Sequence, residues 1–206
     1  DKLVTGVQTC ALPIWPRLTR RPVIPTMIDA VIFDLDETLI DRSASMARYA
    51  VLFYRDFIDQ LRGISVAEIE SVFVALDQRG YRPREEVYAG VVARLPWDPE
   101  PEISVVRDHW RTLFPASAVG RTGLHETLGA LTDWGLRLGI ITNGSVMAQG
   151  AKIERLRLAK YLSSVVISEA VALEKPDPRI FRRALDEIGS DPAATWFVGD
   201  HPVNDG

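Results

Sequence analysis

The chain has 206 residues, 47% of them hydrophobic and 25% charged, which is enough for one buried core with a small satellite in an ordinary water-soluble protein. A formal net charge of −4 without a basic run argues against a nucleic-acid partner, and a lone cysteine with three scattered histidines argues against a disulfide or a Cys/His zinc cluster. The single cysteine fits a reducing cytoplasm best, and because no apolar run approaches the roughly 18 to 20 residues that span a bilayer, we expect no membrane partner.

The first regular pattern in the chain begins near residue 27. Residues 1–21 are left unassigned, and the stretch from Asp1 to about Trp15 resembles translated sequencing-adapter sequence. The run IDAVIFDLD at 28–36 is short, apolar and β-branched, and it ends in acids. This pattern is typical of a buried parallel strand whose functional groups lie at its carboxyl end.

The segment 42–121 is far longer than the roughly 10 to 12 residues that a simple crossover between parallel strands needs. Apolar residues recur at helical spacing within 43–61, 66–77, 84–94 and 103–113. We therefore expect an inserted helical cap. Substrate specificity is expected in the cap and in the segment just after Thr38, where four side chains could face a leaving group: Arg42, Arg48, Tyr49 and Tyr54. The alternative for the arginines is an ordinary solvated helix surface.

Three further strands are predicted at 135–142, 164–168 and 195–199, each after a helical pattern. This alternation predicts an α/β fold, a Rossmann-like doubly wound parallel sheet formed by 22–41 and 122–206. Ligands of such sheets bind beyond the carboxyl ends of the strands. The chain stops at Gly206 directly after a polar loop, so we expect the C-terminal part of the core to be missing.

Asp34 and Asp36 lie at alternate positions where the first strand ends, so both carboxylates can point toward one ligand. Cleavage of a phosphate ester needs a nucleophile and a proton for the leaving alcohol. Asp34 can be the nucleophile, and Asp36 can be the acid and then the base if its surroundings raise its pKa. The alternative is a pair of solvated acids in a turn.

Two later stretches add groups that suit an anion. Thr142 and Asn143 end the second strand before a glycine turn and a helix, a place where phosphate can bind. Lys175 lies in a loop stiffened by two prolines, and the other lysines are only Lys2, Lys152 and Lys160. The alternatives are an ordinary Asn-Gly turn and a salt bridge from Lys175 to Glu174 or Asp177.

Asp200 follows the fourth strand and supplies another carboxylate. Mg²⁺ prefers oxygen ligands and keeps several waters, so Asp34, Asp200 and the main-chain carbonyl of Asp36 would suffice as protein ligands. Asp205 and Thr38 are expected to support these residues, Asp205 by orienting a water molecule or Lys175.

These four stretches, in this order, resemble the haloacid dehalogenase superfamily over about 28–206, in its helical-cap subfamily of phosphoglycolate phosphatases, β-phosphoglucomutases and nucleotidases. The resemblance implies that Asp34 is phosphorylated and that Asp36 is the acid and base. It also implies that Thr142 binds the phosphoryl group, that Lys175 balances charge, and that Asp200 and Asp34 hold Mg²⁺.

The expected function is therefore Mg²⁺-dependent hydrolysis of a small phosphorylated metabolite through an aspartyl-phosphate, by a monomer or homodimer. Asp36 argues against dehalogenation, because a halide leaves without a proton. The absence of lysine from 41–121 argues against phosphonate hydrolysis, which in this family uses a cap lysine. A phosphomutase, or an inactive phosphate-binding protein or fragment, remains an alternative.

Overall fold

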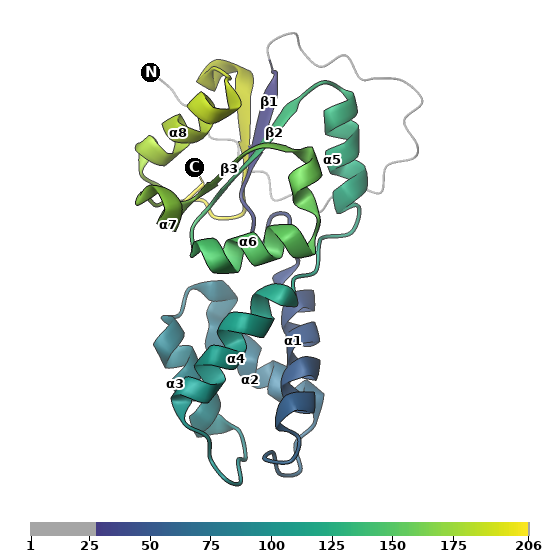
Figure 1. Ribbon diagram of the computed structural model, residues 1–206, viewed down its shortest axis with the longest axis vertical. Coiled ribbons are helices and arrows are strands. Elements are labelled where there is room, and N and C mark those ends of the chain that lie inside the picture. The colour runs from purple at the N-terminus through teal and green to yellow at the C-terminus, as the bar shows by residue number, and fades with distance from the viewer. Residues whose placement is uncertain (1–27, 206) are drawn as a thin grey trace. The chain divides into compact units, whose positions relative to one another are not determined.

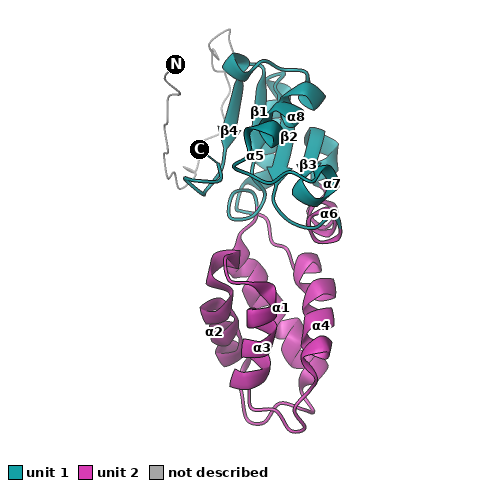
Figure 2. Cartoon of the chain, turned by 90° about the vertical axis from the view of Figure 1, so that its left-hand side faces the viewer, with its two compact units in different colours: residues 1–39, 121–146, 158–206 teal, residues 40–120, 147–157 magenta. Residues whose placement is uncertain are grey.

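The computed structural model describes residues 28–205, so the unassigned segment 1–21 lies outside the described residues. The chain divides into two compact units, shown in teal and magenta in Figure 2. Within the described residues, unit 1 comprises 28–39, 121–146 and 158–205, and unit 2 comprises 40–120 and 147–157. The chain passes between the units at 39/40 and 120/121, within two residues of the boundaries 41/42 and 121/122 expected from the sequence. Residues 147–157 were expected in the core.

Unit 1 contains a four-stranded parallel sheet in the order β3-β2-β1-β4 (Figure 2). The strands are β1 (Ala30–Phe33), β2 (Arg137–Thr142), β3 (Leu162–Ile167) and β4 (Thr195–Val198). All four residues of β1 are buried, as expected for a parallel strand covered on both faces. The predicted fold class is confirmed.

Helices lie on both sides of this sheet, with α8 on one side and α5 on the other (Figure 1). Asp177 caps the start of α8 by accepting a hydrogen bond from the main-chain N–H of Arg179. Ile180, Ala184 and Ile188 follow at helical spacing and form a core with the sheet. The helical elements here are α5 (Leu124–Asp133), η2 (Leu158–Tyr161), α7 (Ser168–Val171), α8 (Pro178–Ile188) and η3 (Pro192–Ala194), and α6 (Val146–Arg155) follows β2.

Unit 2 is built mainly from four helices, as the periodicity predicted. They are α1 (Arg42–Phe57), α2 (Val66–Asp77), α3 (Arg84–Arg94) and α4 (Ile103–Ala116), with a short turn of helix η1 (Gln78–Gly80). An aromatic cluster including Phe53, Phe73 and Trp110 fills its core. No helix within the described residues 28–205 has both the length and the apolar character needed to cross a membrane.

All four proposed specificity residues belong to unit 2, and two of them are buried within it, which corrects the prediction for these two. Tyr49 is fully buried, and its hydroxyl lies 2.9 Å from Nδ1 of His109. Arg42 is buried and donates two hydrogen bonds of 2.7 Å to Asp77, which also accepts one from Arg84. Both side chains stabilise the unit itself. The role expected for Arg48 and Tyr54 stays a prediction.

Candidate active site

Three of the site residues expected from the sequence lie where parallel strands end. Phe33, the last residue of β1, is in register with Ile140 of β2 and Val198 of β4. Asp34 follows β1 at once, and Thr142 and Asp200 each lie two residues beyond these partners. Because the three strands are parallel, these residues are brought to one edge of the sheet.

At this edge Lys175 joins two carboxylates from opposite ends of the chain. Its Nζ lies 2.6 Å from Oδ1 of Asp34 and 2.6 Å from Oδ1 of Asp205. Asp34 and Lys175 are only 7% and 5% exposed, so the ion pair is buried. The other oxygen of Asp205 accepts a hydrogen bond of 2.9 Å from the main-chain N–H of His201. Asp205 therefore fixes the position of the ammonium group.

Burial raises the pKa of Asp34 to about 6, an effect that the Lys175 ammonium opposes but does not cancel. Near neutral pH the carboxylate is therefore mostly ionised while remaining poorly hydrated. An ionised, partly desolvated carboxylate held by a cation is suited to attack an electrophile.

The loop that carries Lys175 is tied to the end of β2. The side-chain amide of Asn143 donates to the main-chain carbonyl of Lys175 at 3.0 Å and accepts from its N–H at 2.9 Å. Asp177 caps α8 and pairs with Arg179. The ammonium group of Lys175 is thus directed at Asp34, and the alternative of a salt bridge to Glu174 or Asp177 is not what the structure shows.

Gly199 allows Asp205 to approach β4. A Cβ atom at this position would lie 2.3 Å from Oδ2 and 2.6 Å from Cβ of Asp205, closer than real contacts permit. The sequence reasoning did not identify this glycine as a site residue. The sequence does show a glycine directly before Asp200. A glycine next to a candidate site residue can indicate that another side chain approaches the backbone closely.

Asp36 lies in a turn, 35–39, which the Leu39 N–H closes by donating to the Leu35 carbonyl at 3.0 Å. Both leucines are buried, whereas Asp36 and Thr38 are half-buried. The Thr38 hydroxyl oxygen is buried and has no hydrogen-bond partner within the described chain. The turn thus holds both polar residues immediately beyond Asp34.

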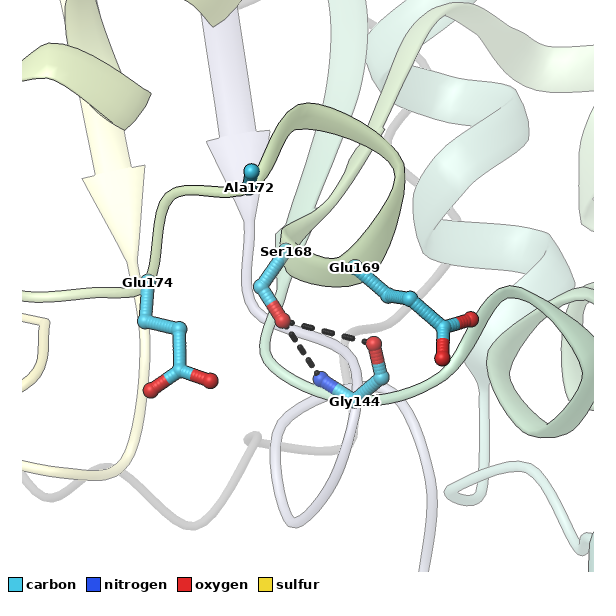
Figure 3. A pocket seen from close by; sticks show the side chains of 5 residues that line it. All are labelled: Gly144, Ser168, Glu169, Ala172 and Glu174. Atoms are coloured by element: carbon cyan, nitrogen blue, oxygen red, sulfur yellow. Dashed lines mark hydrogen bonds between the residues drawn. The ribbon is translucent and has the colours of Figure 1, made fainter.

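A cavity of about 460 Å³ adjoins the loops of Asn143 and Lys175 (Figure 3). Two of its lining residues are joined by a hydrogen bond, which the Gly144 N–H donates to the Ser168 hydroxyl at 2.9 Å. Glu169 accepts from the Val146 N–H at 2.6 Å and so caps α6. The residues that line the cavity are Gly144, Ser168, Glu169, Ala172 and Glu174.

Three carboxylates at this edge can supply oxygen ligands to a cation. One oxygen atom from each of Asp34, Asp200 and Asp205 lies within 4.8 Å of the others. An all-oxygen set of this kind fits Mg²⁺, a hard cation. Both oxygens of Asp205 already accept hydrogen bonds, from Lys175 and His201. Asp200 lies two residues beyond the end of β4.

Fold and site together define an α/β enzyme core with a buried aspartate and lysine at the ends of its strands. The model of the family "haloacid dehalogenase-like hydrolase" matches residues 28–205. The chain therefore belongs to this family of hydrolases, as the sequence motifs indicated.

Named relatives agree with this assignment. The glyceraldehyde 3-phosphate phosphatase of Pyrococcus abyssi is 31% identical over 186 residues, covering 87% of this chain and 76% of the relative. The phosphoglycolate phosphatase of Agrobacterium fabrum is 26% identical, covering 91% and 77%. The magnesium-bound crystal structure of the HAD-hydrolase YfnB from Bacillus subtilis shares the fold, with a TM-score of 0.65, 21% identity and coverage of 86% and 80%.

Proposed function

We propose that the chain is a Mg²⁺-dependent phosphatase that hydrolyses small phosphate monoesters through a phosphoryl group carried on Asp34. The buried contact between Asp34 and Lys175, with Asp205 behind the lysine, carries this proposal. A carboxylate in this setting can attack phosphorus, and the neighbouring ammonium offsets the negative charge of the phosphoryl oxygens.

In the first step an oxygen of Asp34 forms a bond to phosphorus while the bond from phosphorus to the alcohol oxygen breaks. The leaving oxygen takes the electron pair of that bond and a proton from Asp36. The alcohol is released, and the phosphoryl group remains on Asp34 as an acyl phosphate. Asp36 suits this role because the turn 35–39 holds it two residues beyond the nucleophile.

In the second step water attacks the phosphorus of the acyl phosphate. Asp36, now ionised, accepts a proton from that water, and the bond between phosphorus and the Asp34 oxygen breaks. Inorganic phosphate leaves, Asp34 returns as a carboxylate, and Asp36 regains its proton. Lys175 balances charge in both steps through its contact with Asp34.

When Mg²⁺ is bound it supplies positive charge to the phosphoryl oxygens. We assign its side-chain ligands to Asp34 and Asp200, with the Asp36 carbonyl, and we assign to Asp205 the task of holding Lys175. Thr142, 1% exposed at the end of β2, is assigned to the phosphoryl group. The Asn143 side chain contacts the main chain of Lys175, so we propose that it supports the site rather than binding phosphate through its amide.

We propose a small phosphorylated metabolite as the substrate. The two relatives named above are phosphatases of such compounds, glyceraldehyde 3-phosphate and phosphoglycolate. Asp36 supports a phosphate ester over an alkyl halide, because an alcohol leaving group needs the proton that this acid provides.

Turnover of p-nitrophenyl phosphate, with and without Mg²⁺, tests the proposal. We expect hydrolysis that requires the metal and that is lost in Asp34→Asn. Asp186→Asn, which removes an exposed acid on α8, is the matched control and should retain the wild-type rate. Tight binding of a phosphate analogue without any turnover would instead favour an inactive phosphate-binding protein.

A further inference from the structure

Arg121 contacts the turn that carries Asp36, although no sequence motif singles it out. Its main-chain N–H donates to the Leu39 carbonyl at 3.0 Å, so the chain beside Arg121 is hydrogen-bonded to the end of the turn. Arg121 and the turn 35–39 both belong to unit 1. The contact is therefore internal to the unit that contains Asp34.

The guanidinium group of Arg121 binds the middle of this turn. Its Nη2 and Nε donate to the main-chain carbonyl oxygen of Glu37 at 2.6 and 3.2 Å. Nη2 also lies 3.2 Å from Oε2 of Glu37. Two donors of one planar group thus converge on one carbonyl, which fixes its direction as well as its distance.

Glu37 adopts a backbone conformation that needs such support. Its φ is 62°, in the left-handed region that residues other than glycine seldom occupy. A backbone of this kind persists where its surroundings impose it. Here the buried Leu35 and Leu39 hold the ends of the turn, and Arg121 holds its centre.

We propose that Arg121 is a positioning residue for the acid and base Asp36. Asp36 immediately precedes Glu37 in the chain. If the Glu37 backbone could rotate, the Asp36 carboxyl could move away from the leaving oxygen that it protonates. Arg121 acts through the backbone and does not touch the substrate. The inference rests on the proposed phosphatase function.

The rate lost when Arg121 is removed should depend on the leaving group of the substrate. A phenol leaving group needs protonation, whereas p-nitrophenolate is a weaker base and leaves more readily without it. A well-placed general acid contributes roughly 10² to 10⁴-fold to a rate. Loss of its placement should therefore slow phenyl phosphate much more than p-nitrophenyl phosphate.

The test is kcat/KM for both aryl phosphates in wild type and in Arg121→Ala, because this constant reports phosphoryl transfer to Asp34 and not the later hydrolysis. We expect a loss on the order of 10²-fold for phenyl phosphate and of roughly tenfold or less for p-nitrophenyl phosphate. Arg121→Lys, which keeps one donor group, should lose less, and guanidinium ion added to Arg121→Ala should restore part of the phenyl phosphate activity.

Arg137→Ala provides the matched control. Arg137, at the opposite end of β2 from Thr142, also donates to main-chain carbonyls, those of Ile188 and Gly189. Its loss should lower stability without changing the ratio between the two substrates. Equal losses for both substrates in Arg121→Ala and Arg121→Lys, with an active wild type, would overturn the inference alone. A wild type inactive on both would remove the proposed function and the inference together.

Discussion

The ammonium nitrogen of Lys175 lies 2.6 Å from Oδ1 of Asp34, although 141 positions separate the two residues in the chain. The contact exists because β1 and the loop before α8 meet at one edge of the sheet. It places a buried cation against a buried anion, and the behaviour of the site follows from this pair.

Lys175→Met should abolish most phosphatase activity. The substitution keeps the side chain's approximate size but leaves the carboxylate of Asp34 buried without its cation, which raises the pKa of Asp34 further and removes charge that the transition state needs. We expect kcat/KM for p-nitrophenyl phosphate to fall on the order of 10²- to 10³-fold. Lys160→Met, at an exposed lysine, is the control, and equal activity in the two variants would contradict the role of Lys175.

Mg²⁺ affinity should fall as the pH drops below about 6. Burial raises the pKa of Asp34 to about 6, and the metal binds the ionised carboxylate, so protons compete with the metal below that value. The expected weakening is about tenfold per pH unit, measured by titration calorimetry at pH 7.5 and pH 5. Asp34→Asn should bind weakly with little dependence on pH in this range. An affinity for the wild type that is flat between these values would argue against Asp34 as a ligand.

In the absence of metal, the raised pKa of Asp34 makes the folded state less stable at neutral pH than at low pH. The folded state holds the proton of Asp34 more tightly than the unfolded state, whose carboxyl has a pKa of 3.8. Stability contributed by this group is therefore present below about pH 4 and is lost as the pH rises to about 6. Asp34→Asn should raise the melting temperature at pH 7.5 without Mg²⁺ and leave it nearly unchanged at pH 4.

Gly199→Ala should damage the site more than the fold. The added Cβ would overlap Asp205 and displace it from the Lys175 ammonium and the His201 N–H. We expect a loss of activity comparable to that of Asp205→Ala. Gly129→Ala is the control, since a Cβ there meets no atom within 4 Å, and in a helix it should stabilise by up to about 1 kcal/mol. Normal activity of Gly199→Ala would show that Asp205 has no part in the site.

Asp77→Ala should destabilise unit 2 by about 3 to 5 kcal/mol, because it removes the carboxylate that accepts two hydrogen bonds from the buried Arg42 guanidinium. Arg62→Ala, which breaks a surface pair with Asp98, should lower the free energy of unfolding by under about 1 kcal/mol. Denaturant titration measures both changes. Burial raises the pKa of Asp77, but hydrogen bonds from Arg42 and Arg84 outweigh this and lower it. The ion pairs therefore stabilise the unit above about pH 4, and this contribution is lost at lower pH. Equal effects of the two substitutions would be the contrary result.

The sheet and its strand ends could be predicted from the sequence because their signal is local. Each strand is a short apolar run, and Asp34, Thr142 and Asp200 lie at or within two residues of the ends of three of them. Parallel strands have their carboxyl ends at one edge, so sequence position alone indicates that these residues converge.

Contacts that depend on three-dimensional packing could not be predicted in this way. Helical spacing indicates that one face of α1 is buried, but it does not reveal that Arg42 lies on that face opposite Asp77, 35 positions away. The contact of Arg121 with Glu37, 84 positions away, likewise has no local pattern. The demand for glycine at position 199 arises only from where the Asp205 side chain lies.

The most direct test of the central claim is to look for the phosphoryl group on Asp34. Wild-type protein mixed with p-nitrophenyl phosphate and Mg²⁺ is quenched in acid during turnover, digested, and examined by mass spectrometry. We expect phosphate on the peptide that contains Asp34, and none on that peptide from Asp34→Asn. Steady turnover with no phosphate on that peptide, together with a wild-type rate in Asp34→Asn, would contradict it.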